Sequence, residues 1–135
     1  MSSSARYPNR VDQRVLDIIR AIERIQKYVC EMTREQFLSN EMAQDAVARQ
    51  ILIIAEACDK IAEIEDKNEV PADERLRVRC PDIPWSKIKG IGNRIRHGYG
   101  TLDPEMFWET ARSPEDLPPL ESALKAAFPI LARGD

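Results

Sequence analysis

Apolar residues recur every three or four positions in two long stretches, and this spacing constrains the fold more than any other feature of the chain. The first stretch runs from Val11 to Val29 and forms one stripe, which is typical of an amphipathic helix with a single buried face. The second runs from Glu41 to about Asp66, and its apolar surface is wider than one stripe. Such a helix is either central in the fold or shared with a second subunit. The first stripe comprises Val11, Val15, Ile18, Ile19, Ile22, Ile25 and Tyr28, and the second comprises Ala43, Val47, Ile51, Ile54, Cys58 and Ile61, with Ala46, Ile53, Ala57 and Ile64 outside it.

Capping residues mark where other helices begin and end. Thr33 and Gln36 have the spacing of a capping box, so we expect a short helical turn before Asn40, itself a good N-cap for the second long helix. A third long helix is predicted from Pro84 to about His97, where glycines supply the stop. Between these helices, residues 67–83 are polar and proline-containing, which indicates a connecting loop with room for a turn of helix.

Two further helices are predicted near the end of the chain. Asp103 is an N-cap with Pro104 at the first helical position, so a short helix follows. The pair Pro118 and Pro119 then reads as an interruption, and LESALKAAFPIL as the last amphipathic helix. The sequence therefore predicts an all-α antiparallel bundle of about five helices, with a flexible N-terminal segment at 1–9 and a single domain over 10–135.

Charge and cysteine content restrict the class of protein. Twenty basic residues against 23 acidic ones leave a formal net charge of −3, so any binding to phosphate depends on a local patch. Three cysteines without a CxxC pair suit reduced thiols better than a disulfide or zinc framework. No apolar run approaches the roughly 20 residues that span a bilayer, and the start lacks a signal core. We expect a soluble cytoplasmic protein without a membrane segment.

The stretch GNRIRHGYG, residues 92–100, contains the only histidine. At about 100° per residue, His97 lies roughly 200° from Ile95, so it points away from the core face of its helix. Asn93 and Arg94 share its side. Gly92, like Gly90, costs about 1 kcal/mol relative to alanine inside a helix, which indicates that a partner helix or a ligand approaches the backbone there.

Between Trp85 and Thr101 the chain carries four cations and no acidic residue, namely Lys87, Lys89, Arg94 and Arg96. A positive patch around a residue type that exchanges protons near neutral pH suggests phosphate chemistry. The competing interpretation is structural. A histidine in the last turn of a helix often only complements the helix dipole, and Tyr99 beside glycines commonly packs under a turn.

Other charged residues are weaker candidates. Glu56, Asp59 and Glu63 are predicted to form a solvated acidic edge, and their spacing pairs with no histidine, so no metal site is expected. Three alternating arginines in the 67–83 loop either extend a phosphate track or are solvated. They are Arg75, Arg77 and Arg79.

The order of motifs resembles the HepT-like branch of the HEPN superfamily. A DAVxRQ segment leads into IIAEACDKI, and after a polar loop comes PDIPWSKIKGIGNRIRHGYGTLD. The resemblance extends from about Arg10 to Leu131. The matching residues are Asp45, Ala46, Val47, Arg49, Gln50, Ile54, Glu56, Ala57, Pro84, Trp85, Asn93, His97 and Tyr99.

This resemblance implies a HEPN-type bundle that forms a homodimer and cleaves RNA without a metal or other cofactor. It also implies a partner, a nucleotidyltransferase antitoxin of the MntA type that attaches AMP to Tyr99. On that basis His97, Arg96 and Asn93 are the expected catalytic residues. Arg94 and Lys89 are expected to bind RNA phosphates.

One position departs from the family pattern RxxxxHxY, because Gly92 stands where the arginine is expected. Arg96 lies on the same helix face, and the bare glycine leaves room beside it for a long side chain, so Arg96 is a candidate replacement. The alternative is a nuclease-dead HEPN module that binds its nucleotidyltransferase partner or RNA without cutting. An unrelated helical interaction protein is the third interpretation.

Overall fold

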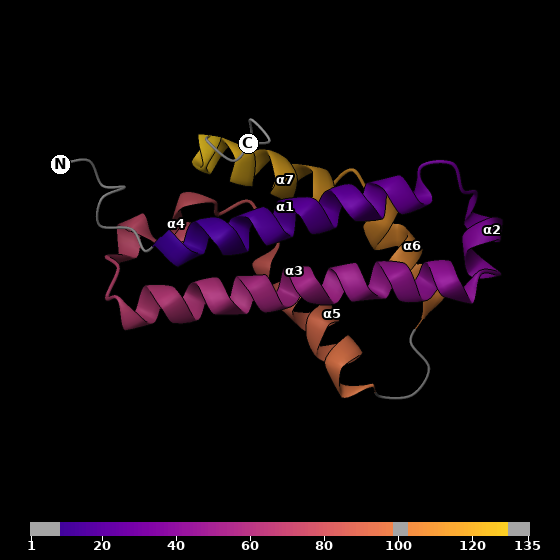
Figure 1. Cartoon of the computed structure of the whole chain (residues 1–135), viewed down its shortest axis with the longest axis horizontal. Helices are drawn as coiled ribbons and strands as arrows, with labels where there is room; N and C mark the ends of the chain where they lie inside the picture. Colours follow the sequence, from indigo (N-terminus) through magenta and orange to yellow (C-terminus); the bar gives the residue numbers. More distant parts are fainter. Residues whose placement is uncertain (1–8, 99–102, 130–135) are drawn as a thin grey trace.

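The computed structural model of the chain describes residues 9–98 and 103–129, and these contain helices and no β-strand. Two long helices, α1 (Asn9–Val29) and α3 (Glu41–Lys67), run antiparallel and side by side (Figure 1). The other helices pack around this pair. The predicted all-α antiparallel bundle is therefore confirmed, and the two long helices end within two residues of the predicted positions.

The core lies between α1, α3 and the helices that cover them. The α1 stripe is buried as predicted except at Tyr28, which is exposed while Val29 beside it is buried. On α3 the burial extends around much of the helix because α1, α5 and α6 all contact it. A central position thus accounts for part of its wide apolar surface, since Ala57 is buried whereas Ala46, Ile53 and Ile64 are half-buried. Fully or nearly fully buried members of this core include Val11, Val15, Ile18, Ile22, Ile25, Val47, Ile51, Ile54 and Ile61.

A short helix, α2 (Arg34–Leu38), joins α1 to α3. The predicted capping box is present, since Thr33 accepts the Gln36 N–H and the Gln36 side chain accepts the Thr33 N–H. The Asn40 side chain likewise accepts the Ala43 N–H and starts α3. The hydrogen bonds that begin these two helices are the ones that the sequence predicts.

The loop after α3 holds more structure than a polar connection needs. It contains a 3₁₀ turn at Ala72–Glu74 and the short helix α4 (Leu76–Arg79). The buried carboxylate of Glu65 on α3 accepts the Leu76 N–H at 2.8 Å, which ties the start of α4 to the bundle. Arg75 pairs with Asp66.

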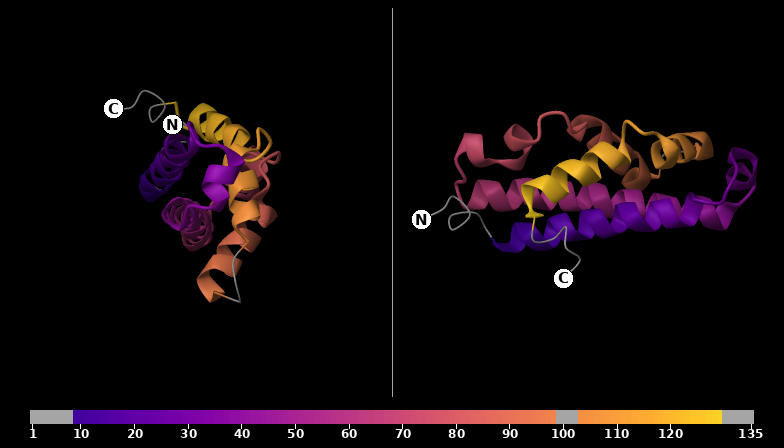
Figure 2. Two further views of the ribbon diagram at one scale, coloured as in Figure 1. Left: turned by 90° about the vertical axis from the view of Figure 1, so that its right-hand side faces the viewer. Right: turned by 90° about the horizontal axis from the view of Figure 1, so that it is seen from above.

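Three helices complete the bundle: α5 (Trp85–His97), α6 (Pro104–Arg112) and α7 (Leu117–Ala127). Helix α5 crosses α3 and projects away from the α1–α3 pair, whereas α7 lies along the side of α1 (Figures 1 and 2). Asp103 caps α6 with Pro104 in its first turn, as predicted. The beginning of α7 was predicted too late. Pro118 and Pro119 do not interrupt the chain but lie in the first turn of α7, where a missing N–H costs no helical hydrogen bond.

The limits of the described residues bear on two predictions. Of the segment 1–9, only Asn9 is described, and it begins α1, so the division into a flexible segment and a single domain over 10–135 stays a prediction. Within the two described ranges, no helix is long and apolar enough to cross a membrane.

Candidate functional site

Helix α5 presents His97 at its exposed end. Trp85, Ile88, Ile91 and Ile95 pack inward against the core, which fixes the rotation of the helix about its axis. His97 is exposed on another side, as the periodicity predicted. The helix ends at Gly98, whose left-handed backbone (φ 58°) suits a residue without Cβ and whose N–H donates to the Arg94 carbonyl.

Helices α5 and α3 approach each other closely at Gly92. A Cβ placed on Gly92 would stand 2.3 Å from Cβ of Ala55, so only glycine lets the two backbones come this close. The expected partner helix is therefore α3. At Gly90 no helix among the described residues takes this place, because a Cβ there meets nothing within 4 Å, and a ligand or a second subunit at Gly90 stays a prediction.

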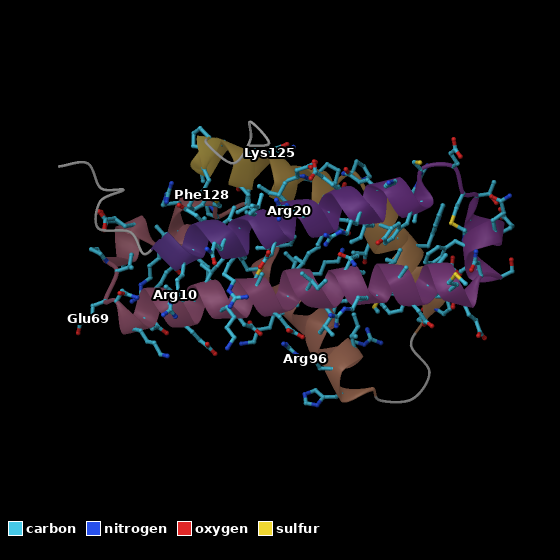
Figure 3. The ribbon with its side chains drawn as sticks, viewed as in Figure 1. Arg10, Arg20, Glu69, Arg96, Lys125 and Phe128 are labelled. Carbon is cyan, nitrogen blue, oxygen red and sulfur yellow. The ribbon has the colours of Figure 1, made fainter. Side chains whose placement is uncertain are left out.

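Arg96 lies one turn after Gly92 and reaches toward α3, in the angle between the two helices (Figure 3). Its Nη1 and Nη2 donate to Oδ2 of Asp59 at 3.4 and 3.3 Å, and Nη2 donates to Oδ1 of Asn93 at 2.7 Å. Nη2 also lies 3.6 Å from the position that a Gly92 Cβ would take. The guanidinium thus occupies the space beside the bare glycine.

Asn93 connects Arg96 to the side of α5 that carries His97. At about 100° per residue, Asn93 stands roughly 40° from His97 on one side, and Arg94 roughly 60° from it on the other. Arg96 follows beyond Asn93. The order around the last two turns is therefore Arg94, His97, Asn93 and Arg96.

The predicted positive patch is present but partly neutralised. Lys87 pairs with Asp116 of the α6–α7 connection at 2.9 Å, and Arg96 pairs with Asp59. Lys89 and Arg94 are exposed, with Arg94 Nη1 3.5 Å from the sulfur of Met106. The carboxylates that contact the patch come from outside α5, so counting charges along α5 alone overstates its positive charge.

Two of the three arginines of the 67–83 loop have structural partners, whereas Arg77 is exposed. Arg75 binds Asp66 and the Val70 carbonyl, and Arg79 donates to the Ala127 carbonyl and lies over the ring of Phe128. These contacts fasten the loop to α3 and α7. Arg75 and Arg79 are thus held by neighbouring elements, and a phosphate track along this loop stays a prediction.

Two of the three free cysteines are unsuited to nucleophilic chemistry. Burial, reinforced by the negative charge of neighbouring Asp59, raises the pKa of Cys58 to about 12. Burial also raises the pKa of Cys80, while Cys30 is exposed. A thiol with a raised pKa holds its proton at neutral pH, and the thiolate is the reactive form.

The sequence analysis missed the role of Asp59. It was predicted to belong to a solvated acidic edge, yet its side chain is only 34% exposed and binds Arg96. The signal that could have found it is a matched spacing. Ala55 and Asp59 are one turn apart on α3, as Gly92 and Arg96 are on α5, so a close crossing at the small residues brings the opposite charges together.

Two other predictions concern Tyr99 and metal binding. Tyr99 lies outside the described residues, so its position relative to His97 stays a prediction. No group of three histidine, cysteine, aspartate or glutamate side chains in residues 9–98 and 103–129 is placed to hold a metal ion.

Comparison with known proteins gives a consistent set of relatives. The family described as "Ribonuclease HepT-like" matches residues 18–127. "Probable ribonuclease HepT" of Thermococcus cleftensis is 35% identical over 106 residues, which cover 78% of this chain and 84% of the relative. "Putative RNase MJ0125" and "Putative RNase MJ1216" of Methanocaldococcus jannaschii are each 30% identical over 96 residues, or 71% of this chain and 73% and 70% of theirs. No solved structure matches the chain significantly.

Proposed function

Since the chain belongs to the ribonuclease HepT-like family, we propose that it is a toxin-type endoribonuclease that acts as a homodimer and needs no metal. Its active site is the exposed last turn of α5. His97 of one subunit faces its mate across the dimer interface, so that one imidazole serves as base and the other as acid. The single observation that carries this proposal is the grouping of His97, Asn93 and Arg96 on the part of α5 that projects from the bundle.

The reaction is an internal transesterification of RNA. One imidazole removes the proton of a ribose 2′-OH, the 2′-oxygen bonds to the adjacent phosphorus, and the bond from phosphorus to the 5′-oxygen breaks. The second imidazole gives that oxygen a proton. The products are a 2′,3′-cyclic phosphate and a 5′-hydroxyl, and positive charge over the phosphorane lowers the barrier.

Arg96 supplies the charge that the family pattern places at position 92. Its guanidinium lies beside Gly92, 3.6 Å from where a side chain at 92 would begin. Asn93 stands between Arg96 and His97 around the helix, and its Oδ1 accepts from Arg96. Lys89 and Arg94 are exposed cations on the same helix, and they bind flanking RNA phosphates.

A nucleotidyltransferase antitoxin of the MntA type restrains the nuclease in the cytoplasm by attaching AMP to Tyr99. The acceptor follows His97 by two residues, so the modification adds a phosphate and a bulky nucleoside next to the site. Incubation with such a partner and ATP is expected to add one AMP mass to the wild-type chain and none to Tyr99→Phe. Labelling of Tyr99→Phe at the wild-type level would assign the acceptor elsewhere.

A second candidate function is a nuclease-dead HEPN module that binds its nucleotidyltransferase partner or RNA. Two observations support this second candidate. The family's arginine is replaced by Gly92, and the replacement candidate Arg96 shares its charge with Asp59. Both weaken the positive charge available to a phosphorane.

Cleavage of single-stranded RNA in a buffer with excess chelator separates these functions. We expect the wild-type chain to produce cyclic phosphate ends and His97→Ala to lose this activity, because no other histidine can replace it. Lys27→Ala, which changes an exposed cation on α1, serves as the matched control and should cleave normally. RNA binding without cleavage by the wild type would support the binding module, and cleavage unaffected by His97→Ala would refute the proposed site.

A further inference from the structure

The crossing of α3 and α5 places two opposite charges at a fixed separation. Gly92 and Ala55 form the contact point, and one turn later on each helix Arg96 meets Asp59. Because the backbones approach so closely at the glycine, the Arg96 side chain, which lies in the angle between the helices (Figure 3), reaches the Asp59 carboxylate. The ion pair therefore depends on the crossing at Gly92, the position at which the family pattern has an arginine.

This ion pair is partly shielded from solvent. The Arg96 side chain is 30% exposed and the Asp59 side chain 34%. A partly buried pair is screened less than an exposed one, and Asn93 provides a third point of attachment through a 2.7 Å hydrogen bond. Three of the five guanidinium N–H groups are engaged in this way. For the other two, the described residues offer no partner.

We propose that Asp59 is a positioning residue for Arg96 in RNA cleavage, an inference that rests on the proposed function. The carboxylate and the Asn93 amide fix the guanidinium beside Gly92, and the two remaining N–H groups are left to donate to phosphate oxygens. Asp59 has a second effect of opposite sign. Its negative charge opposes that of RNA, so it aligns the arginine at the expense of substrate affinity.

These two effects predict a division between kcat and KM. Asp59→Ala removes the alignment and the negative charge together, so kcat falls about tenfold while KM falls or stays unchanged. Asp59→Asn keeps an oxygen that accepts from Arg96 without the charge, so it retains kcat within about threefold of wild type. Glu63→Gln, on the same helix one turn further, removes a more exposed carboxylate that pairs only with Lys60 among the described residues, and it should change neither constant.

A double-mutant cycle with Arg96→Ala tests whether Asp59 acts through the arginine. We expect Asp59→Ala to have no further effect on kcat once Arg96 is alanine, because the residue being positioned is gone. An equal loss of kcat in both backgrounds would overturn the inference, as would an unchanged kcat in Asp59→Ala. Thermal unfolding of each variant separates these outcomes from a loss of fold.

A readout without cleavage separates failure of this inference from failure of the proposed function. In ¹⁵N NMR spectra, the Arg96 Nη signals are resolved only when rotation of the guanidinium is slow, and Arg96→Ala assigns them. We expect resolved signals in wild type and Glu63→Gln, and averaged signals in Asp59→Ala. If the wild type cuts no RNA, the proposed function fails, while the same spectra and the affinity for a 2′-deoxy RNA analogue still decide the positioning role. Arg96 signals that are unaffected by Asp59→Ala, or an analogue affinity that this substitution lowers, would refute it.

Discussion

Substitution by alanine is expected to affect the free energy of unfolding differently at two glycines of α5 that are two residues apart. At Gly90 an added Cβ meets nothing within 4 Å, so Gly90→Ala gains only helix propensity, about 0.5–1 kcal/mol in the free energy of unfolding. At Gly92 the same Cβ would stand 2.3 Å from Cβ of Ala55, closer than the 3.0 Å below which real Cβ atoms essentially never approach. Overpacking of this kind costs about 1–3 kcal/mol, which offsets or exceeds the gain in propensity.

The difference between the two variants is therefore expected to be about 1–3 kcal/mol, with Gly92→Ala the less stable. Urea unfolding followed by circular dichroism measures it, provided that the transitions remain two-state with equal m-values. Equal stability of Gly90→Ala and Gly92→Ala would refute the close crossing of α3 and α5.

A compensating variant sharpens the test. Combining Gly92→Ala with Ala55→Gly removes the clash, because the remaining contact with the backbone Cα at position 55 is an ordinary 3.8 Å. The propensity gained on α5 is lost again on α3, so the double variant should return close to wild-type stability. If it instead loses the sum of the two single effects, the substitutions act independently and the proposed contact is absent.

Three further predictions concern parts of the bundle outside the site. Glu65→Ala removes the buried acceptor of the Leu76 N–H and should lower the free energy of unfolding by about 1–3 kcal/mol in urea titration. Glu65→Gln keeps an acceptor and should lower it less. Equal losses in the two variants would contradict the role of this hydrogen bond at the start of α4. Thr33→Ala should cost about 1 kcal/mol through loss of the capping box, and no loss would mean that the turn needs no cap. With a thiol reagent at pH 8, Cys30 should react in the native state and Cys58 only after unfolding, and native labelling of Cys58 would refute its burial. The pKa of Cys58 is raised to about 12 in the folded state, whereas in the unfolded chain this thiol ionises near its ordinary pKa. The free energy of unfolding should therefore fall as the pH rises above about 9.

Local signals predicted the beginnings of α2, α3 and α6 because a cap is made within four residues of chain. Thr33, Asn40 and Asp103 each accept a backbone N–H two or three residues ahead. No tertiary contact is needed to form such a bond. The amphipathic stripe of α1 was predicted for a similar reason, since its period depends only on helix geometry.

The beginning of α7 shows where local signals are ambiguous. Two consecutive prolines are compatible either with a break in a helix or with the first turn of one. In neither place would a backbone N–H donate a hydrogen bond within the helix, so proline, which has none, is tolerated in both. Leu117, Leu120 and Leu124 are buried on one side of α7. Their packing requires the helix to begin at Leu117, and this requirement comes from the core rather than from the prolines.

The candidate site divides in the same way. The rotation of α5, and with it the exposure of His97, follows from the spacing of its isoleucines. The pairs Asp59 with Arg96 and Asp116 with Lys87 depend on how α5 crosses other elements, and one helix carries no information about that angle. Charge counted along α5 therefore identified the cations correctly but not the carboxylates that moderate them.

The most direct test of the central claim is the cleavage rate of Arg96→Ala in chelator, compared with that of Lys89→Ala. If Arg96 replaces the arginine absent at position 92, its loss should lower kcat about 10²–10³-fold, because it stabilises charge in the transition state. Lys89→Ala should mainly weaken RNA binding and reduce the slope of log K against log salt concentration by about one, because one phosphate contact is lost. Undiminished cleavage by Arg96→Ala would contradict the account.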